Sequence, residues 1–208
     1  NTKIFLDSGD PQETKAILQS IGFLDGQTTN PSLIVKNPEV QECKTREKRC
    51  SEEDLLGYYK NIVTDLRELL SNNQSISIEV YADKNTTAQE MIAQGNVMNT
   101  WIPDAHIKLP ITSAGLEAAQ HFVNNRVNVN MTLCFTVQQA LAVHEATKGC
   151  VKGQVYISPF IGRLDDFGTS GVALVKDILD SYYSLKSNVE VLAASIRSKE
   201  HVQETLTL

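Results

Sequence analysis

The sequence predicts an α/β fold of the TIM type, a (β/α)8 barrel in which helices surround parallel strands. Short β-forming runs alternate with helical segments along almost all of the 208 residues. This alternation is typical of parallel strands that are joined by crossover helices. The connections are short, and the length of the chain suits one well-cored unit. Residues 1–208 are therefore expected to form a single α/β-barrel domain.

Seven runs rich in β-forming residues are the predicted strands. They cover residues 3–7, 26–29, 75–81, 106–110, 127–133, 154–158 and 190–194. The helices between them begin at recognisable capping signals. Asp10 precedes Pro11, a proline suited to the first position of a helix, and Ser51 with Asp54 resembles a capping box before helix 55–70. Capping residues also precede three later helices: Thr112 before 114–123, Thr136 before 137–147, and Thr169 or Ser170 before 172–185.

Polar and apolar residues alternate along two of the predicted strands. Asn128, Asn130 and Thr132 share one face of the fifth strand, and Ser77 and Glu79 share one face of the third. Such alternation usually marks a sheet with one face in water, but helices would cover both faces of an open sheet here. A closed barrel puts the polar face in the lumen, where active sites form near the carboxyl ends of the strands. An open doubly wound sheet is the alternative, although the chain lacks its glycine-rich phosphate motifs.

One lysine interrupts the fourth strand. Lys108 lies among β-forming residues, and Pro110 ends the run. Burial of an amine disfavours the ammonium form, so the neutral amine becomes available as a nucleophile. A neutral amine that faces a sugar carbonyl forms a Schiff base. The alternative is a lysine that extends from an edge strand into solvent.

Composition excludes several classes of function. The formal net charge of −6 disfavours a nucleic-acid-binding protein, and no apolar run is long enough for a membrane span. The four cysteines form no Cys-x-x-Cys pair, so free thiols in a reducing cytoplasm are expected. His144-Glu145 begins like a zinc-protease helix, but Lys148 occupies the place of the second ligand. No metal or other cofactor is expected.

On the barrel interpretation, the strand ends bring together an amine, two carboxylates, several amides and hydroxyls, and an anion site. These residues are Asp7, Thr29, Asn30, Glu79, Lys108, Asn130, Thr132, Ser158 and Arg163. Seven runs resemble, in order, those of the transaldolase family: 6–10, 28–33, 78–80, 107–109, 130–133, 157–163 and 194–197. The most diagnostic are Thr-Thr-Asn-Pro-Ser at 28–32 and Ser-Pro-Phe-x-Gly-Arg at 158–163.

The resemblance implies transfer of a dihydroxyacetone unit through a lysine Schiff base. The donor would be a ketose phosphate, sedoheptulose 7-phosphate or fructose 6-phosphate, and the acceptor an aldose phosphate of the pentose phosphate pathway. Lys108 would form the Schiff base, and Asp7 would take the proton of the C4 hydroxyl. Glu79 and Thr132 would hold the water of the dehydration step. The implied binding residues are Asn30 and Asn130 for sugar hydroxyls, Phe135 near the amine, and Ser158, Arg163 and Arg197 for the phosphate. Sugar phosphates and, in a homo-oligomer, further copies of the chain are the expected partners.

Some of these residues also have structural explanations. Asp7 would cap the turn into the first helix, and Asn30, which precedes Pro31, would serve only as a turn residue. An inward-facing Glu79 without a basic neighbour would be costly unless it is functional or paired.

Two departures from the family pattern shape the functional prediction. The chain stops after the seventh strand and its helix, so the eighth βα unit is expected to be missing and the domain to be truncated at its C-terminal end. The run 163–168 resembles the small transaldolase subgroup that includes fructose-6-phosphate aldolase. Glu79 and Phe135 instead resemble true transaldolases, because the aldolase subgroup carries Gln and Tyr there. Transfer is thus expected to exceed cleavage. The alternatives are a lyase that releases dihydroxyacetone, an enzyme for another anionic ketose, and a catalytically silent barrel that acts as a binding or scaffold protein.

Overall fold

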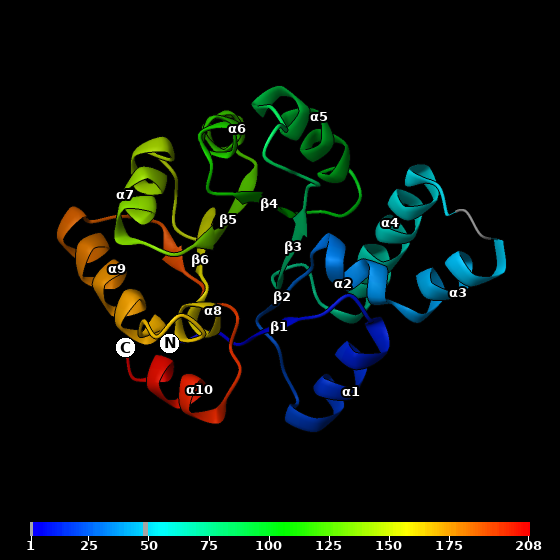
Figure 1. The fold of residues 1–208 in the computed structure, drawn as a ribbon, viewed down its shortest axis with the longest axis horizontal. Helices are drawn as coiled ribbons and strands as arrows, with labels where there is room; N and C mark the ends of the chain where they lie inside the picture. Colours follow the sequence, from blue (N-terminus) through cyan, green and yellow to red (C-terminus); the bar gives the residue numbers. More distant parts are fainter. Residues whose placement is uncertain (1, 48–49) are drawn as a thin grey trace. The chain divides into compact units, whose positions relative to one another are not determined.

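The computed structural model describes residues 2–47 and 50–208, without the side chains of residues 46 and 47 (Figure 1). The strands among these residues are β1 (Phe5–Asp7), β2 (Gly26–Thr28), β3 (Ser75–Glu79), β4 (His106–Pro110), β5 (Asn128–Cys134), β6 (Val155–Pro159) and β7 (Glu190–Val191). They form a sheet in the order β1-β2-β3-β4-β5-β6-β7. The pairs β1–β2, β2–β3, β5–β6 and β6–β7 are parallel.

At least one helix follows each of these strands. The helices are α1 (Pro11–Ile21), α2 (Pro31–Lys36), α3 (Pro38–Glu47), α4 (Glu52–Leu69), α5 (Ala88–Met98), α6 (Ser113–Asn124), α7 (Val137–Ala146), α8 (Ile161–Asp165), α9 (Gly171–Leu185) and α10 (Lys199–Leu206). Parallel strands in sequential order with helices between them confirm the predicted α/β fold of the TIM type.

The residues predicted as N-caps lie at the starts of the predicted helices. The Asp10 side chain accepts a hydrogen bond from the Gln12 amide, and the main-chain and side-chain bonds of the capping box at the start of α4 are both present. Thr112 and Thr136 cap α6 and α7. Ser170, not Thr169, caps α9. Helices α2, α3, α5 and α8 were not expected; α2 and α8 span only 6 and 5 residues, too few to show an apolar period.

Strand β7 is shorter than the predicted run 190–194, because its neighbour ends in a proline. The Ala194 amide donates to the Pro159 carbonyl at 2.8 Å, and Phe160 forms an isolated bridge with Ala194. Pro159 has no N–H, so it cannot donate the return bond of a continuous ladder. The backbone pairing therefore continues past Val191 only as single contacts.

The described chain forms two compact units, Asn1–Tyr81 with Ala93–Ile107 and Ala82–Ile92 with Lys108–Leu208. In the first unit, α4 packs against α1, α2 and β3. Its apolar stripe buries Ile62, Val63 and Leu66, and β3 contributes the fully buried Ile76 and Ile78. Helix α4 therefore brings its inward-facing side chains close to the end of β3.

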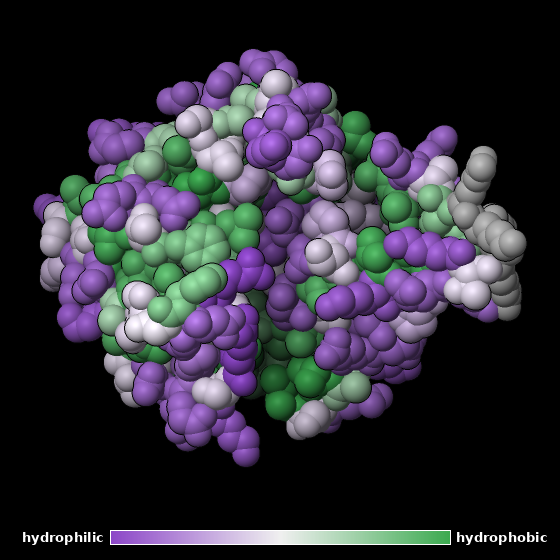
Figure 2. Space-filling view, viewed as in Figure 1, coloured by the Kyte–Doolittle hydropathy of each residue, from purple (hydrophilic) through white to green (hydrophobic). Residues whose placement is uncertain are grey.

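In the second unit, the helices α6, α7 and α9 pack on β5 and β6 (Figure 1). Val129 and Met131 of β5 are fully buried, and so is Asn130 between them; Thr132 is 1% exposed. Both faces of the strand are thus covered, as the alternating pattern predicted for a strand of this fold. Hydrophilic side chains cover much of the visible surface of each unit (Figure 2). Within residues 2–47 and 50–208, no helix is both long and apolar enough to cross a membrane.

Candidate active site

The lysine of β4 is buried. Lys108 is 5% exposed, and its strand neighbours Ile107 and Leu109 are fully buried. Pro110 follows two residues later and ends the strand. Lys108 therefore does not extend into solvent from an edge strand, which was the alternative explanation of this residue. A lysine side chain held in this way is a candidate nucleophile for Schiff-base chemistry.

Asn130 and Thr132 lie on the same face of β5, and both are buried. The Ser158 hydroxyl of β6 donates to Oδ1 of Asn130 at 2.8 Å, which fixes the orientation of the amide. The Thr132 carbonyl accepts from the Ile111 amide at 3.0 Å. Among the described residues, Oγ1 of Thr132 has no hydrogen-bond partner. A buried hydroxyl in this state is a natural contact for a water or a substrate oxygen.

A β-bulge follows Thr132. The register of β5 against β6 shifts between Met131 and Cys134, and Leu133 has a φ of 63°. A left-handed backbone at a leucine is strained, and such bulges often redirect side chains beside active sites. The Gln139 side chain of α7 stabilises it: Oε1 accepts from the Phe135 amide at 2.8 Å, and Nε2 donates to the Leu133 carbonyl at 3.4 Å.

Phe135 lies just beyond this bulge and is half-buried. Its ring packs edge-on against Phe160, with 5.7 Å between the ring centroids. The preceding Cys134 is fully buried, and that burial raises the pKa of its thiol to about 11. Cys134 therefore stays protonated at neutral pH and does not compete with Lys108 as a nucleophile.

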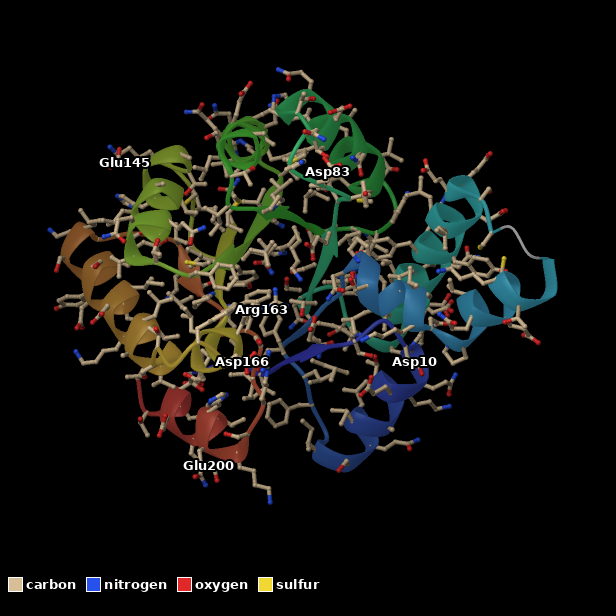
Figure 3. All side chains as sticks on the ribbon, in the orientation of Figure 1. Asp10, Asp83, Glu145, Arg163, Asp166 and Glu200 are labelled. Carbon is tan, nitrogen blue, oxygen red and sulfur yellow. The ribbon has the colours of Figure 1, made fainter. Side chains whose placement is uncertain are left out.

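Arg163 projects from the short helix α8, where it is exposed (Figure 3). Its guanidinium carbon lies 5.7 Å from the centroid of the Phe160 ring, a cation–π contact that orients the side chain. Gly162 lets α8 approach the segment that carries Arg197: its amide donates to the Ser195 carbonyl at 3.0 Å, and a Cβ at position 162 would lie 2.5 Å from that oxygen. Any side chain at this position would therefore push the segment away.

The structure pairs Arg197 with a residue that the sequence analysis does not single out. Nη1 of Arg197 lies 2.5 Å and 2.6 Å from the two carboxylate oxygens of Asp166. Both side chains are about half exposed, so the pair contributes little to stability. Asp166 is the residue directly after α8, the helix that carries Arg163 (Figure 3). An anion that binds Arg197 must share the guanidinium with this carboxylate or displace it.

The first unit carries three further residues with predicted catalytic or substrate-binding roles. Asp7 is the last residue of β1 and is exposed, and the Thr28 hydroxyl donates to its Oδ1 at 2.7 Å. Asp10, not Asp7, caps α1. Oδ1 of Asn30 caps α2 by accepting from the Leu33 amide at 2.9 Å, so Asn30 has a structural role as well; the amino group of the same side chain takes no part in that cap.

Glu79 is the last residue of β3 and is half-buried. Its main-chain amide donates to the Tyr59 hydroxyl at 2.8 Å. Asp7 and Glu79 therefore each end their strand, and Asn30 follows β2 by two residues. In parallel sheets of this fold type, functional residues lie at the carboxyl ends of strands.

The sequence also matches a known family as a whole. The model of the family Transaldolase/Fructose-6-phosphate aldolase matches residues 4–208. The chain belongs to this family. Among curated proteins, it is 39% identical to the probable transaldolase of Caulobacter vibrioides (strain NA1000 / CB15N) over 204 residues, which are 97% of this chain and 79% of the relative. It is 34% identical to the probable transaldolase of Lactiplantibacillus plantarum over 202 residues, 97% of this chain and 79% of the relative.

Membership of the transaldolase/fructose-6-phosphate aldolase family confirms the resemblance seen in the sequence motifs. Several residues that hold those motifs in place escaped the sequence analysis: Thr28, Tyr59, Gln139 and Asp166. Thr28 lies inside a matched run and Asp166 inside the run 163–168, but nothing local shows which side chain each would contact. Tyr59 has the spacing of an ordinary core residue in α4, and Gln139 that of an ordinary helix residue in α7. Among the described residues, no group of three or more His, Cys, Asp or Glu side chains is arranged to hold a metal ion.

Proposed function

We propose that this chain transfers a dihydroxyacetone unit from a ketose phosphate to an aldose phosphate through a Schiff base on Lys108. The observation that carries the proposal is the buried lysine of β4 in a chain of the transaldolase/fructose-6-phosphate aldolase family. A lysine held away from water is the nucleophile that imine chemistry requires. Two features of the same unit support it further: the Thr132 hydroxyl has no hydrogen-bond partner within the described part of the chain, and Ser158 donates to Asn130.

The first half-reaction breaks one carbon–carbon bond. The Lys108 amine attacks the C2 carbonyl of the ketose phosphate, and the carbinolamine loses water to give an iminium ion. Glu79 and Thr132 hold and polarise that water. Asp7 takes the proton of the C4 hydroxyl, the C3–C4 bond breaks, and its electron pair moves into the iminium, which becomes an enamine. The aldose phosphate leaves.

The second half-reaction runs in reverse with a new acceptor. The enamine carbon attacks the aldehyde of an acceptor aldose phosphate, such as erythrose 4-phosphate, and Asp7 returns its proton to the new hydroxyl. Water then releases the product ketose from Lys108. Asn30 and Asn130 bind the hydroxyls of the three-carbon unit during the exchange. Ser158, Arg163 and Arg197 bind the phosphate, for which the planar guanidinium fork is well matched.

We also propose that the protein works in the cytoplasm. The proposed donors and acceptors are sugar phosphates of the pentose phosphate pathway. The four cysteines are all free thiols, which suits the reducing environment of the cytoplasm.

The balance between transfer and cleavage tests the proposed reaction. Release of free dihydroxyacetone requires a proton on the enamine and a water at the iminium, and the ring of Phe135 supplies neither. Fructose 6-phosphate turnover would be measured with and without erythrose 4-phosphate in the parent protein. We expect turnover to be much faster with the acceptor. A parent that releases dihydroxyacetone as fast as it transfers the unit would instead be a lyase.

Phe135→Tyr should shift this balance toward cleavage. The added hydroxyl delivers a proton or orders a water at small steric cost, because the residue is only half-buried. We expect the cleavage-to-transfer ratio to rise by up to about 100-fold, the lower end of what a positioned acid contributes. Phe167→Tyr makes the same change at a highly exposed ring of the same unit and should leave the ratio unchanged. An unchanged ratio in Phe135→Tyr would mean that this ring does not control the fate of the enamine.

Arg163→Ala should selectively weaken the use of phosphorylated substrates. Losing one charge-assisted contact to phosphate costs about 1.5–3 kcal/mol, so KM for fructose 6-phosphate should rise about 10- to 100-fold. The reaction with unphosphorylated fructose should change little. Lys176→Ala removes an exposed cation of α9 with the same change in net charge and serves as the control. Equal losses with both sugars would show that Arg163 supports the fold of α8 rather than the phosphate.

A further inference from the structure

A buried tyrosine of α4 joins two segments of the first unit that carry predicted site residues. Tyr59 is 4% exposed. Its hydroxyl oxygen lies 2.8 Å from the Glu79 amide nitrogen and 2.7 Å from Oγ1 of Thr29. Oγ1 of Thr29 lies in turn 2.7 Å from the Ser77 carbonyl oxygen. A hydroxyl on a helix is thus placed between the end of β3 and the turn that follows β2.

The chemistry of the groups fixes the direction of this hydrogen-bond chain. An amide N–H only donates and a carbonyl only accepts, so the Glu79 amide donates to Tyr59 and the Thr29 hydroxyl donates to Ser77. The Thr29 hydroxyl has one proton, so it must accept the proton of the Tyr59 hydroxyl. Burial raises the pKa of Tyr59 above its usual value, which keeps that proton in place.

The Tyr59 hydroxyl accepts the hydrogen bond of the Glu79 amide in place of a main-chain carbonyl, which β2 does not supply. Strand β2 pairs with β3 up to Thr28 opposite Ser77, and the Thr29 amide then donates to the Ser77 carbonyl. Beyond Thr29 the chain turns at Asn30 into α2, so no regular strand continues opposite Glu79. A buried amide without a partner is costly, and a side chain from α4 takes the place of the missing carbonyl.

The ring of Tyr59 is itself held in place. It packs edge-on against Trp101, with 5.7 Å between the ring centroids and 64° between the ring planes. A phenylalanine would fill the same core position, so burial alone does not require the hydroxyl. The hydroxyl matters because of the two polar groups that it satisfies.

We propose that Tyr59 is a positioning residue for Glu79. It does not act on substrate; it fixes the main chain from which the Glu79 side chain starts and holds the Thr29–Asn30 turn at the same time. This inference rests on the proposed function, in which Glu79 handles the water of carbinolamine dehydration. Loss of the Tyr59 hydroxyl should therefore slow formation of the iminium, while phosphate binding by Arg163 is unaffected.

Tyr59→Phe tests this inference, and the chain offers a matched control. Tyr182 of α9 is also 4% exposed, and its hydroxyl donates to the Ala140 carbonyl at 2.8 Å. Tyr182→Phe is the same substitution at a tyrosine of the other unit, and it also removes a buried hydroxyl. In Tyr59→Phe we expect kcat to fall about tenfold, with KM for fructose 6-phosphate nearly unchanged. The rate at which the borohydride-trapped adduct forms in a single turnover should fall by the same factor. Tyr182→Phe should keep kcat, KM and the adduct rate close to those of the parent.

A second readout does not depend on catalysis. Hydrogen exchange of the Glu79 amide, followed by NMR, should accelerate in Tyr59→Phe and not in Tyr182→Phe. Unchanged exchange, or a kcat equal to that of Tyr182→Phe, would overturn the role of Tyr59. A parent protein without turnover would overturn the proposed function instead, and the exchange measurement would still report on the hydrogen bond.

A conservative replacement covers the case in which Tyr59→Phe does not fold. p-Aminophenylalanine at position 59 keeps a hydrogen-bonding group where the hydroxyl lies. We expect this variant to fold, and its kcat to follow the exchange of the Glu79 amide: kcat should stay near that of the parent if exchange stays slow, and fall if exchange accelerates. A folded variant in which the two readouts separate, with parent-like exchange and slow turnover or with accelerated exchange and parent-like turnover, overturns the inference.

Discussion

Lys108→Arg should abolish both turnover and covalent labelling. Arginine keeps the positive charge and much of the length of the side chain, but its guanidinium does not form an imine with a ketose. In the parent protein, borohydride reduction in the presence of fructose 6-phosphate should add one reduced three-carbon unit to the intact mass. In Lys108→Arg the mass should not change, and activity should fall to background.

Lys152→Arg is the matched control for this experiment. Lys152 belongs to the same unit and is exposed, so the same substitution there removes an accessible amine without touching the buried one. It should label and turn over like the parent. Labelling that persists in Lys108→Arg, or a label that peptide mapping finds on another lysine, would show that the amine nucleophile is misassigned.

Asp7→Asn should stop carbon–carbon cleavage while still permitting the Schiff base. The amide keeps an Oδ1 that accepts from the Thr28 hydroxyl, so the local geometry is preserved and only the basic group is lost. Removing a general base should lower kcat by about 10²- to 10⁴-fold. Borohydride should then trap the uncleaved six-carbon sugar on Lys108 in place of the three-carbon unit, which separates the two steps by mass.

The same change three residues later provides the comparison for Asp7→Asn. Asp10 caps α1 through Oδ1, and asparagine caps helices about as well as aspartate. Asp10→Asn should therefore keep parent activity and trap the three-carbon unit. If Asp7→Asn retains high turnover, or if it loses adduct formation altogether, Asp7 is not the base that acts at the C4 hydroxyl.

Local signals in the sequence were enough to predict most of the fold. Asp10 with Pro11 and the capping box at Ser51 start helices through contacts within a few residues, so their pattern can be read directly from the chain. The β-forming run around Lys108 predicted a buried strand, with an edge strand as the alternative, and the lysine is buried. The early end of β7 cannot be predicted from the residues of that strand alone, because it depends on Pro159 in the neighbouring strand β6.

The parts of the candidate site that escaped prediction depend on contacts between distant segments. Arg197 lies 31 residues from Asp166, and only the packing of α8 against the segment after β7 brings the two charges together. Tyr59 lies 20 residues before Glu79 and looks like any other member of the apolar stripe of α4. The residues expected to act on substrate belong to recognisable motifs, whereas the residues that hold them are defined only by tertiary structure.

The left-handed turn at Leu133 separates the residues of β5 that carry predicted site side chains from Phe135, which follows the end of the strand. Up to Thr132, pairing with β6 sets the direction of each side chain. Beyond the bulge, Cys134 pairs with Pro159 of β6 again, and the main chain of Phe135 after it is held by the Gln139 side chain of α7. Substitutions in α7 can therefore retune the orientation of the Phe135 ring while Asn130 and Thr132 keep their register. The orientation of this ring can therefore change without any change in the strands.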